Sequence, residues 1–185
     1  DDGFYFDPDV HDFEQKMVLG HKIPAGRGIE DALHVLGLLA VHPSTARFIA
    51  YKLCRRFVSD DPPASLVDST ALQFIVTNGE IAPVLRHIFT SQEFIAATGQ
   101  KLRRPYEFFI GALRATDTQI PFWRMIEMLQ DLAQLPYGWH PPDGYPDAAG
   151  AWMSSSGLLA RWNIAMTLTH EAASEPYTDL RAHLF

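Results

Sequence analysis

The chain lacks the features that define several classes of protein. Its only cysteine is Cys54, so no disulfide can form within the chain, and we expect this thiol to be a small buried hydrophobe. No uninterrupted apolar run approaches the roughly 20 residues that cross a bilayer. The net charge of −7 leaves no dominant basic surface. These absences exclude a disulfide scaffold, a transmembrane segment and a dedicated nucleic-acid binder.

The remaining composition is that of a globular protein. The 185 residues are 47% hydrophobic and 20% charged, which is enough apolar material for a core that needs neither a disulfide nor a metal. We therefore expect no cofactor. The chain opens Asp1-Asp2-Gly3 with no methionine or signal peptide, so we expect a fragment or a processed product.

Helical periodicity dominates the sequence from Ile29 to Thr169. Its clearest example is residues 43–57, where Pro43 suits the first helical position and apolar residues recur at helical spacing. Residues 3–24 differ, because short apolar pieces are separated by Asp7-Pro8-Asp9 and closed by Gly20. The pattern predicts an all-α fold of about seven helices around one core, with a small N-terminal β-hairpin or extended arm.

We divide the chain into an extended arm or hairpin over residues 1–28, a helical domain over 29–170 and a tail over 171–185. The apolar stripes of the helices predict which side chains point inward. The expected core residues are Leu36, Ile49, Leu53, Phe57 and Trp162.

Several separated segments also resemble one known family. They are His11–Gly20, HPSTARFIAYKL from His42, Ser91-Gln92-Glu93-Phe94, Pro105-Tyr106-Glu107-Phe108, Gly144, Trp152 and Arg161-Trp162-Asn163. This ordered set resembles the C-terminal part of the bacterial domain-of-unknown-function family DUF1800. The resemblance implies a mostly helical bacterial protein, often exported to the periplasm or outside the cell and often encoded beside a sulfatase-like protein. It supplies no catalytic residues.

The best candidate surface is a Pro/Gly-rich loop over residues 135–150. Flat rings beside polar groups suit sugars, and loops on rigid scaffolds often carry function. A long loop also needs apolar anchors, and a strap on the helices is the interpretation of these rings that we favour over a binding surface. We expect a shallow groove between this loop and the start of the final helix, with an exposed Arg161 guanidinium. The candidate ligand-binding residues are Trp139, His140, Tyr145, Trp152 and Arg161.

No complete catalytic motif is visible. His11-Asp12 is an alternative metal pair, but a turn in which Asp12 accepts backbone N–H bonds also explains it. His170-Glu171 lacks the second histidine of a zincin, because Ser174 occupies that position. The serines at 154–156 lack the frame of a nucleophile elbow, and helix capping explains one of them. Basic residues at 47, 52, 55, 56, 103 and 104 form either a solvated face or an anion site.

The sequence therefore indicates a non-catalytic interaction or ligand-binding module, with a glycan as one candidate partner. One alternative is a hydrolase acting on glycan or ester, whose site is completed by an N-terminal portion outside this chain. A second alternative is a structural subunit bound to a sulfatase-like partner.

Overall fold

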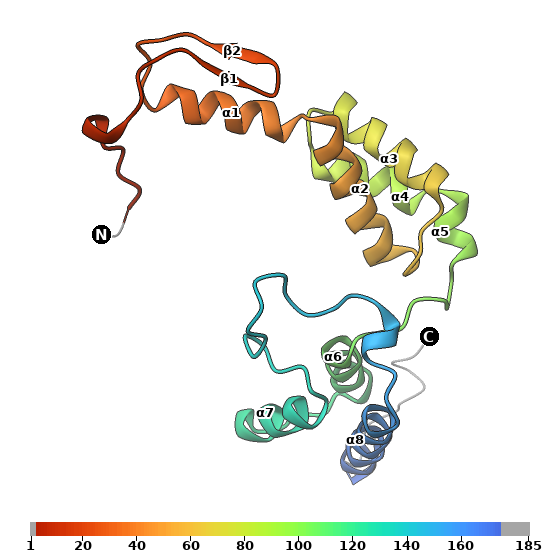
Figure 1. The fold of residues 1–185 in the computed structure, drawn as a ribbon. Coiled ribbons are helices and arrows are strands. Elements are labelled where there is room, and N and C mark those ends of the chain that lie inside the picture. Colours follow the sequence, from red (N-terminus) through yellow and green to blue (C-terminus); the bar gives the residue numbers. More distant parts are fainter. Residues whose placement is uncertain (1–2, 175–185) are drawn as a thin grey trace. The chain divides into compact units, whose positions relative to one another are not determined.

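The structure is a computed structural model that describes residues 3–174 (Figure 1). In that range it has eight α-helices and one two-stranded sheet near the N-terminus. The prediction of an all-α fold with a small hairpin is confirmed. Residues 175–185 of the predicted tail lie outside the described residues, and the final helix continues to Ser174.

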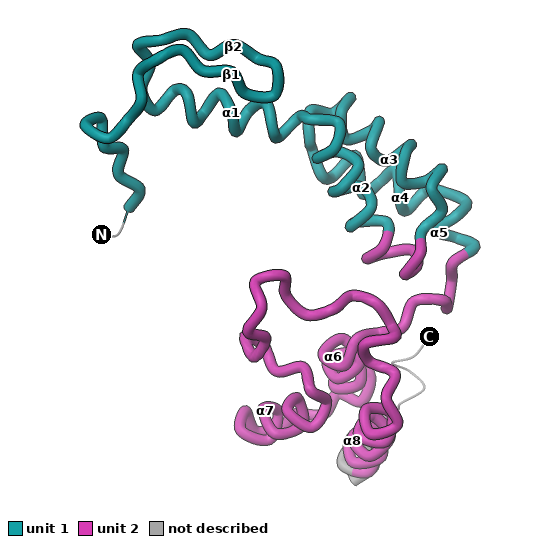
Figure 2. Tube along the Cα trace, in the orientation of Figure 1, with its two compact units in different colours: residues 1–54, 62–96 teal, residues 55–61, 97–185 magenta. Residues whose placement is uncertain are grey.

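The chain forms two compact units (Figure 2). Unit 1 comprises residues 1–54 and 62–96, and unit 2 comprises residues 55–61 and 97–185. The boundary falls inside one helix, between Cys54 and Arg55. No feature of the sequence predicted this division.

The hairpin joins β1 (Lys16–Val18) to β2 (His21–Ile23) in antiparallel register, with Lys16 opposite Ile23. Leu19 and Gly20 form the connection, with φ angles of 50° and 80°. Two successive positive φ angles are typical of the type I′ turn, whose twist matches that of the strands. A 3-10 turn, η1 (Pro8–Val10), precedes the hairpin and is capped by the Asp7 side chain.

The helices of unit 1 begin with α1 (Glu30–Ala40) and α2 (Pro43–Phe57). They continue with α3 (Ala64–Val76), α4 (Ile81–Phe89) and α5 (Gln92–Ala96). Pro43 is the first residue of α2, as predicted. Ser91 Oγ accepts a hydrogen bond from the Phe94 amide and caps α5. Within residues 3–174, no single helix is both long enough and apolar enough to span a membrane. Helices α1 and α2 meet the length and composition criteria only when taken together, and they are bent by 56° relative to each other.

The inward face of α2 differs from the predicted one. Ala46, Ala50 and Cys54 are fully buried, whereas Ile49 and Leu53 are only half-buried. Phe57 and Leu36 are exposed, so their assignment to the core was wrong. A helix with a broad apolar stripe can be rotated to bury either edge, and here the row of small residues lies at the centre.

Unit 2 contains α6 (Pro105–Thr116), α7 (Phe122–Asp131), the 3-10 turn η2 (Ala149–Ala151) and α8 (Ser155–Ser174). Its core consists of Phe109, Met128, Leu129, Leu132, Ile164 and Leu168. Trp162 is 68% exposed, so its assignment to the core was wrong as well. The inward face of α8 instead carries Ile164 and Leu168, with Arg161 one turn earlier on the same side.

Candidate functional site

The loop between α7 and η2 is held by the polar atoms of its own aromatic residues. The Tyr145 hydroxyl donates to the Leu135 carbonyl at 2.8 Å, and Trp152 Nε1 donates to the Pro146 carbonyl at 2.9 Å. Trp139 Nε1 donates to Asp143 Oδ1 at 3.2 Å. These bonds fix the fold of the loop.

The same three rings form a row. The centroids of Trp139 and Tyr145 are 5.1 Å apart, and those of Tyr145 and Trp152 are 5.8 Å apart. Trp152 is buried, Tyr145 is half-buried, and Trp139 and His140 are exposed. The structure thus brings three of the five candidate residues into direct contact and leaves His140 in solvent.

An ion network within unit 2 holds the far end of the loop. Glu107 accepts hydrogen bonds from Arg56 and from Arg104, the latter through Nη2 at 2.7 Å. Arg56 also donates to Asp147 at 3.2 Å. Lys101 donates to Asp60 Oδ1 at 2.5 Å and to the Asp147 carbonyl at 2.9 Å.

This network determines the protonation of Glu107. Burial would raise the pKa of Glu107, but hydrogen bonds from Arg56 and Arg104 outweigh burial and leave that pKa below its usual range. Glu107 is therefore a carboxylate at neutral pH and a structural partner of two arginines. Arg56 and Arg104 belong to this network, while Arg47 pairs with Asp68 at 3.2 Å.

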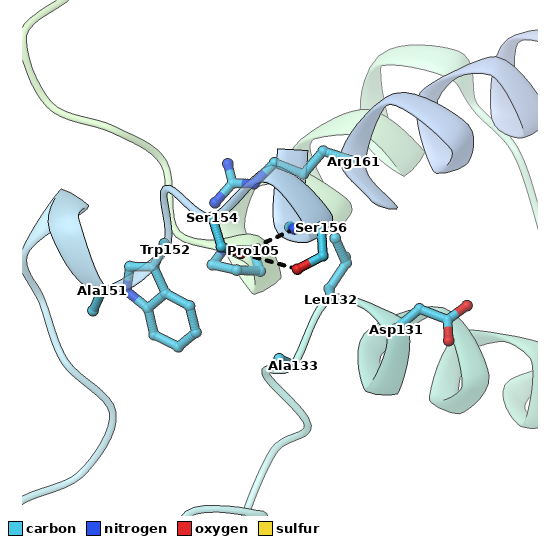
Figure 3. Close-up of a pocket in the computed structure, with 10 residues that line it drawn as sticks. Pro105, Asp131, Leu132, Ala133, Ala151, Trp152, Ser154, Ser156 and Arg161 are labelled. Atoms are coloured by element: carbon cyan, nitrogen blue, oxygen red, sulfur yellow. Dashed lines mark hydrogen bonds between the residues drawn. The ribbon is translucent and has the colours of Figure 1, made fainter. Parts of the chain in front are cut away.

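A pocket of about 140 Å³ opens at the start of α8, beside the end of the loop (Figure 3). Trp152 and Arg161 both line it, together with Ser154 and Ser156. This is the place where the sequence predicted a groove. Arg161 is buried at 9% exposure, however, so the expectation of an exposed guanidinium was wrong. Its Nη1 donates to the Arg103 carbonyl at 2.9 Å, and its guanidinium lies 5.7 Å from the centre of the Phe108 ring.

A second, more open groove of about 370 Å³ lies where α6 begins and α7 ends. We call it the tyrosine groove; it is lined by Arg104, Tyr106, Gln134, Pro136, Tyr137 and Tyr145. Only Tyr145 was among the candidate residues. Tyr137 could have been predicted as well, because it is another aromatic residue in the same Pro/Gly-rich loop. Gln134 could not, because nothing in the neighbouring sequence marks it as a groove residue.

His11 and Asp12 have separate roles in unit 1. Asp12 Oδ1 accepts the Glu14 amide at 2.9 Å, which is the turn bond considered above. His11 Nε2 lies 3.1 Å from the Arg27 carbonyl and 3.5 Å from Asp31 Oδ2. Among the described side chains, those of residues 3–170, the structure has no cluster of three or more His, Cys, Asp or Glu residues able to hold a metal ion.

Asp31 is the buried centre of this region. Lys16 Nζ lies 3.0 Å from its Oδ2, and Arg27 Nε lies 3.4 Å from its Oδ1. The hydrogen bond from Lys16 is the main cause that lowers the pKa of Asp31 below its usual range. Lys16 belongs to β1 and Asp31 to α1, so this carboxylate joins the hairpin to the first helix.

The fold thus defines a helical protein with an N-terminal hairpin and, in unit 2, a groove beside a loop that is held by hydrogen bonds and ion pairs. The chain belongs to the family described as "Protein of unknown function (DUF1800)", whose model matches residues 1–185. The resemblance seen in the sequence is therefore confirmed. No curated protein and no solved structure shows significant similarity to the chain.

Proposed function

We propose that unit 2 is a non-catalytic ligand-binding module whose tyrosine groove holds a short glycan segment. The observation that carries this proposal is Tyr137. Its side chain is fully exposed, and its backbone has a φ of 62°.

Both properties of Tyr137 oppose stability. A left-handed backbone costs a residue other than glycine roughly 1–2 kcal/mol. An exposed ring contributes no burial to offset this cost. Strained positions that stability does not explain are concentrated at binding sites.

The other residues of the groove add fixed polar groups. Gln134 Oε1 accepts the Tyr106 amide at 2.8 Å, so the side-chain amide is oriented and its nitrogen remains a donor. Arg104 is held by Glu107, and Tyr145 is held by the Leu135 carbonyl. A pyranose presents an apolar C–H face and a rim of hydroxyls, and it would pair with ring faces and with these fixed donors and acceptors.

The test is a titration with chito-, cello- and malto-oligosaccharides followed by tryptophan fluorescence. Trp139 packs on Tyr145, a residue of the groove, so occupancy should change its emission. Tyr137→Ala should weaken binding by about tenfold, as expected for an aromatic anchor. Tyr5→Ala is the matched control, because Tyr5 is an exposed tyrosine in unit 1. Equal responses of the wild type and Tyr137→Ala, or no response to any sugar, would contradict the proposal.

Product analysis of the same mixtures separates a binding module from the hydrolase alternative. A general acid must be protonated at working pH, whereas the arginines keep Glu107 ionised. We therefore expect the oligosaccharides to be recovered intact. Shorter sugars formed by the wild type would favour a hydrolase.

A further inference from the structure

Arg161 is a buried cation without an acidic partner. It is 9% exposed, and burial lowers the pKa of its guanidinium, although an arginine keeps its charge at neutral pH. Among residues 3–170, whose side chains the structure describes, no carboxylate forms an ion pair with it. Buried charges are normally paired, so this guanidinium is an exception that requires an explanation.

The unpaired atoms of Arg161 form one edge of the guanidinium. Nη1 is used by the Arg103 carbonyl, whereas Nε and Nη2 are buried with no hydrogen-bond partner. The N–H bonds of Nε and Nη2 point in the same direction. They form a fork that matches the two oxygens of a carboxylate.

Arg161 lines a pocket that has one polar side and one apolar side, and its Nε and Nη2 are buried beside it. In Figure 3 the Arg161 side chain extends from α8 toward Ser154, Pro105 and Trp152. Ser154 Oγ accepts the Gly157 amide at 3.0 Å and lies 3.3 Å from Ser156 Oγ, so both hydroxyls mark the N-terminus of α8. That end of a helix favours negative charge.

We propose that this pocket, the Arg161 pocket, binds a small organic carboxylate. A shift of the Arg161 side chain opens its buried Nε and Nη2 to the pocket, and the carboxylate group pairs with them near the Ser154 and Ser156 hydroxyls. The apolar part of the ligand lies against Trp152, Leu132 and Pro105. The tyrosine groove is a separate site, so this inference does not depend on the glycan proposal.

The pocket suits a small carboxylate better than a single water molecule or a phosphate ion. Its volume of about 140 Å³ exceeds the roughly 10–15 Å³ that one water needs on the same measure. A dianionic phosphate would face Arg161, the one cationic side chain among the residues that line the pocket. A monoanion with an apolar body matches both the charge and the lining.

The test uses acetate, benzoate and inorganic phosphate as probes of the intact chain. Calorimetry measures affinity, and the NMR signal of the Arg161 Nε–H reports contact with the fork. We expect benzoate to bind more tightly than acetate, and acetate more tightly than phosphate. Arg161→Lys keeps the charge but removes the fork, and should weaken benzoate binding by about tenfold or more. Arg114→Lys, at an exposed position of α6, is the matched control and should bind like the wild type.

A second variant leaves Arg161 in place. Ser156 is exposed and lies in the first turn of α8, so replacing it should not disturb folding. Ser156→Ala removes a hydroxyl from the polar side of the pocket and should weaken benzoate binding about two- to fivefold. If Arg161→Lys does not fold, unchanged affinity in Ser156→Ala overturns the proposal. It is also overturned by absent benzoate binding at millimolar concentration, by tighter binding of phosphate, or by wild-type affinity in Arg161→Lys.

Discussion

Glu107 accepts side-chain hydrogen bonds from Arg56 and Arg104 and a backbone bond from the Arg104 amide at 3.2 Å. The two arginines come from the end of α2 and the start of α6, and Arg56 also contacts Asp147 in the loop. A single carboxylate therefore connects three segments that are far apart in the sequence. Local sequence patterns could not identify these partners, because the segments meet only in the folded chain.

Acidification should weaken this connection. The pKa of Glu107 is lowered in the folded state, so its contribution is complete above the unfolded pKa of about 4.3 and is lost as pH falls through the folded pKa. Glu107→Gln should lower the free energy of unfolding at pH 7 by about 1–3 kcal/mol. It should also reduce the loss of stability between pH 5 and 3, measured by urea unfolding.

The control for this prediction is Glu127→Gln, at an exposed position of α7. It should behave like the wild type at both pH values. An equal loss of stability on acidification in Glu107→Gln and in the wild type would contradict the assignment.

Asp31 has the corresponding function in unit 1. Asp31→Asn removes the charge that faces Lys16, Arg27 and His11. We expect faster amide exchange across β1 and β2 and earlier proteolysis between residues 12 and 24. Asp68→Asn removes an exposed partner of Arg47 in the same unit and should leave that exchange unchanged. Unaltered protection of the hairpin in Asp31→Asn would show that the strands are held by other contacts.

In the hairpin turn, substitutions at two adjacent residues should change the free energy of unfolding in opposite directions. Leu19 is exposed and adopts a φ of 50°, a conformation that asparagine tolerates better than leucine. Leu19→Asn should raise the free energy of unfolding by about 0.5–1 kcal/mol. Gly20 has a φ of 80°, so Gly20→Ala should lower it by about 1 kcal/mol. Chemical denaturation measures both changes, and a shift of the same sign in both variants would contradict the turn assignment.

The helices could be predicted from the sequence, but their orientation could not. Pro43, the apolar spacing and the Ser91 cap set where helices begin and which segments are helical. Which edge of a broad apolar stripe is buried depends on the packing partners, and these are distant in the sequence. For this reason Trp162 was assigned to the core, whereas Leu168 occupies it.

The orientation of α8 can be tested by two truncations. Leu168 is fully buried, so Leu168→Ala should cost about 2–5 kcal/mol. Trp162→Ala removes a larger but exposed side chain and should cost below about 1 kcal/mol. Thermal and denaturant unfolding give both values. A larger loss in Trp162→Ala would mean that the opposite face of α8 is buried.

Local sequence patterns say least about features that depend on the whole chain, such as pockets and the division into two units. The loop residues Trp139, Tyr145 and Trp152 could be identified as candidates because aromatic residues are conspicuous in a Pro/Gly-rich segment. The Arg161 pocket and the tyrosine groove depend on Pro105 and Gln134, which tertiary packing brings to the loop. The division into two units depends in the same way on long-range contacts.

This division predicts two separable unfolding transitions, and the sequence supplies a natural reporter for each. All four tryptophans lie in the second unit, at positions 123, 139, 152 and 162. Cys54, the single cysteine, is fully buried in the first unit, and burial raises its thiol pKa, so it should react only after that unit opens.

Ile88→Ala in α4 and Leu129→Ala in α7 each truncate a fully buried side chain and should each cost about 2–5 kcal/mol. Ile88→Ala should shift the denaturant midpoint of Cys54 labelling and leave the tryptophan transition in place, because the contacts it removes belong to unit 1. Leu129→Ala should do the reverse. Thiol labelling and tryptophan fluorescence recorded on the same samples measure both transitions. If each variant moved both transitions equally, the chain would unfold as one cooperative body, because two-state behaviour requires different probes to coincide.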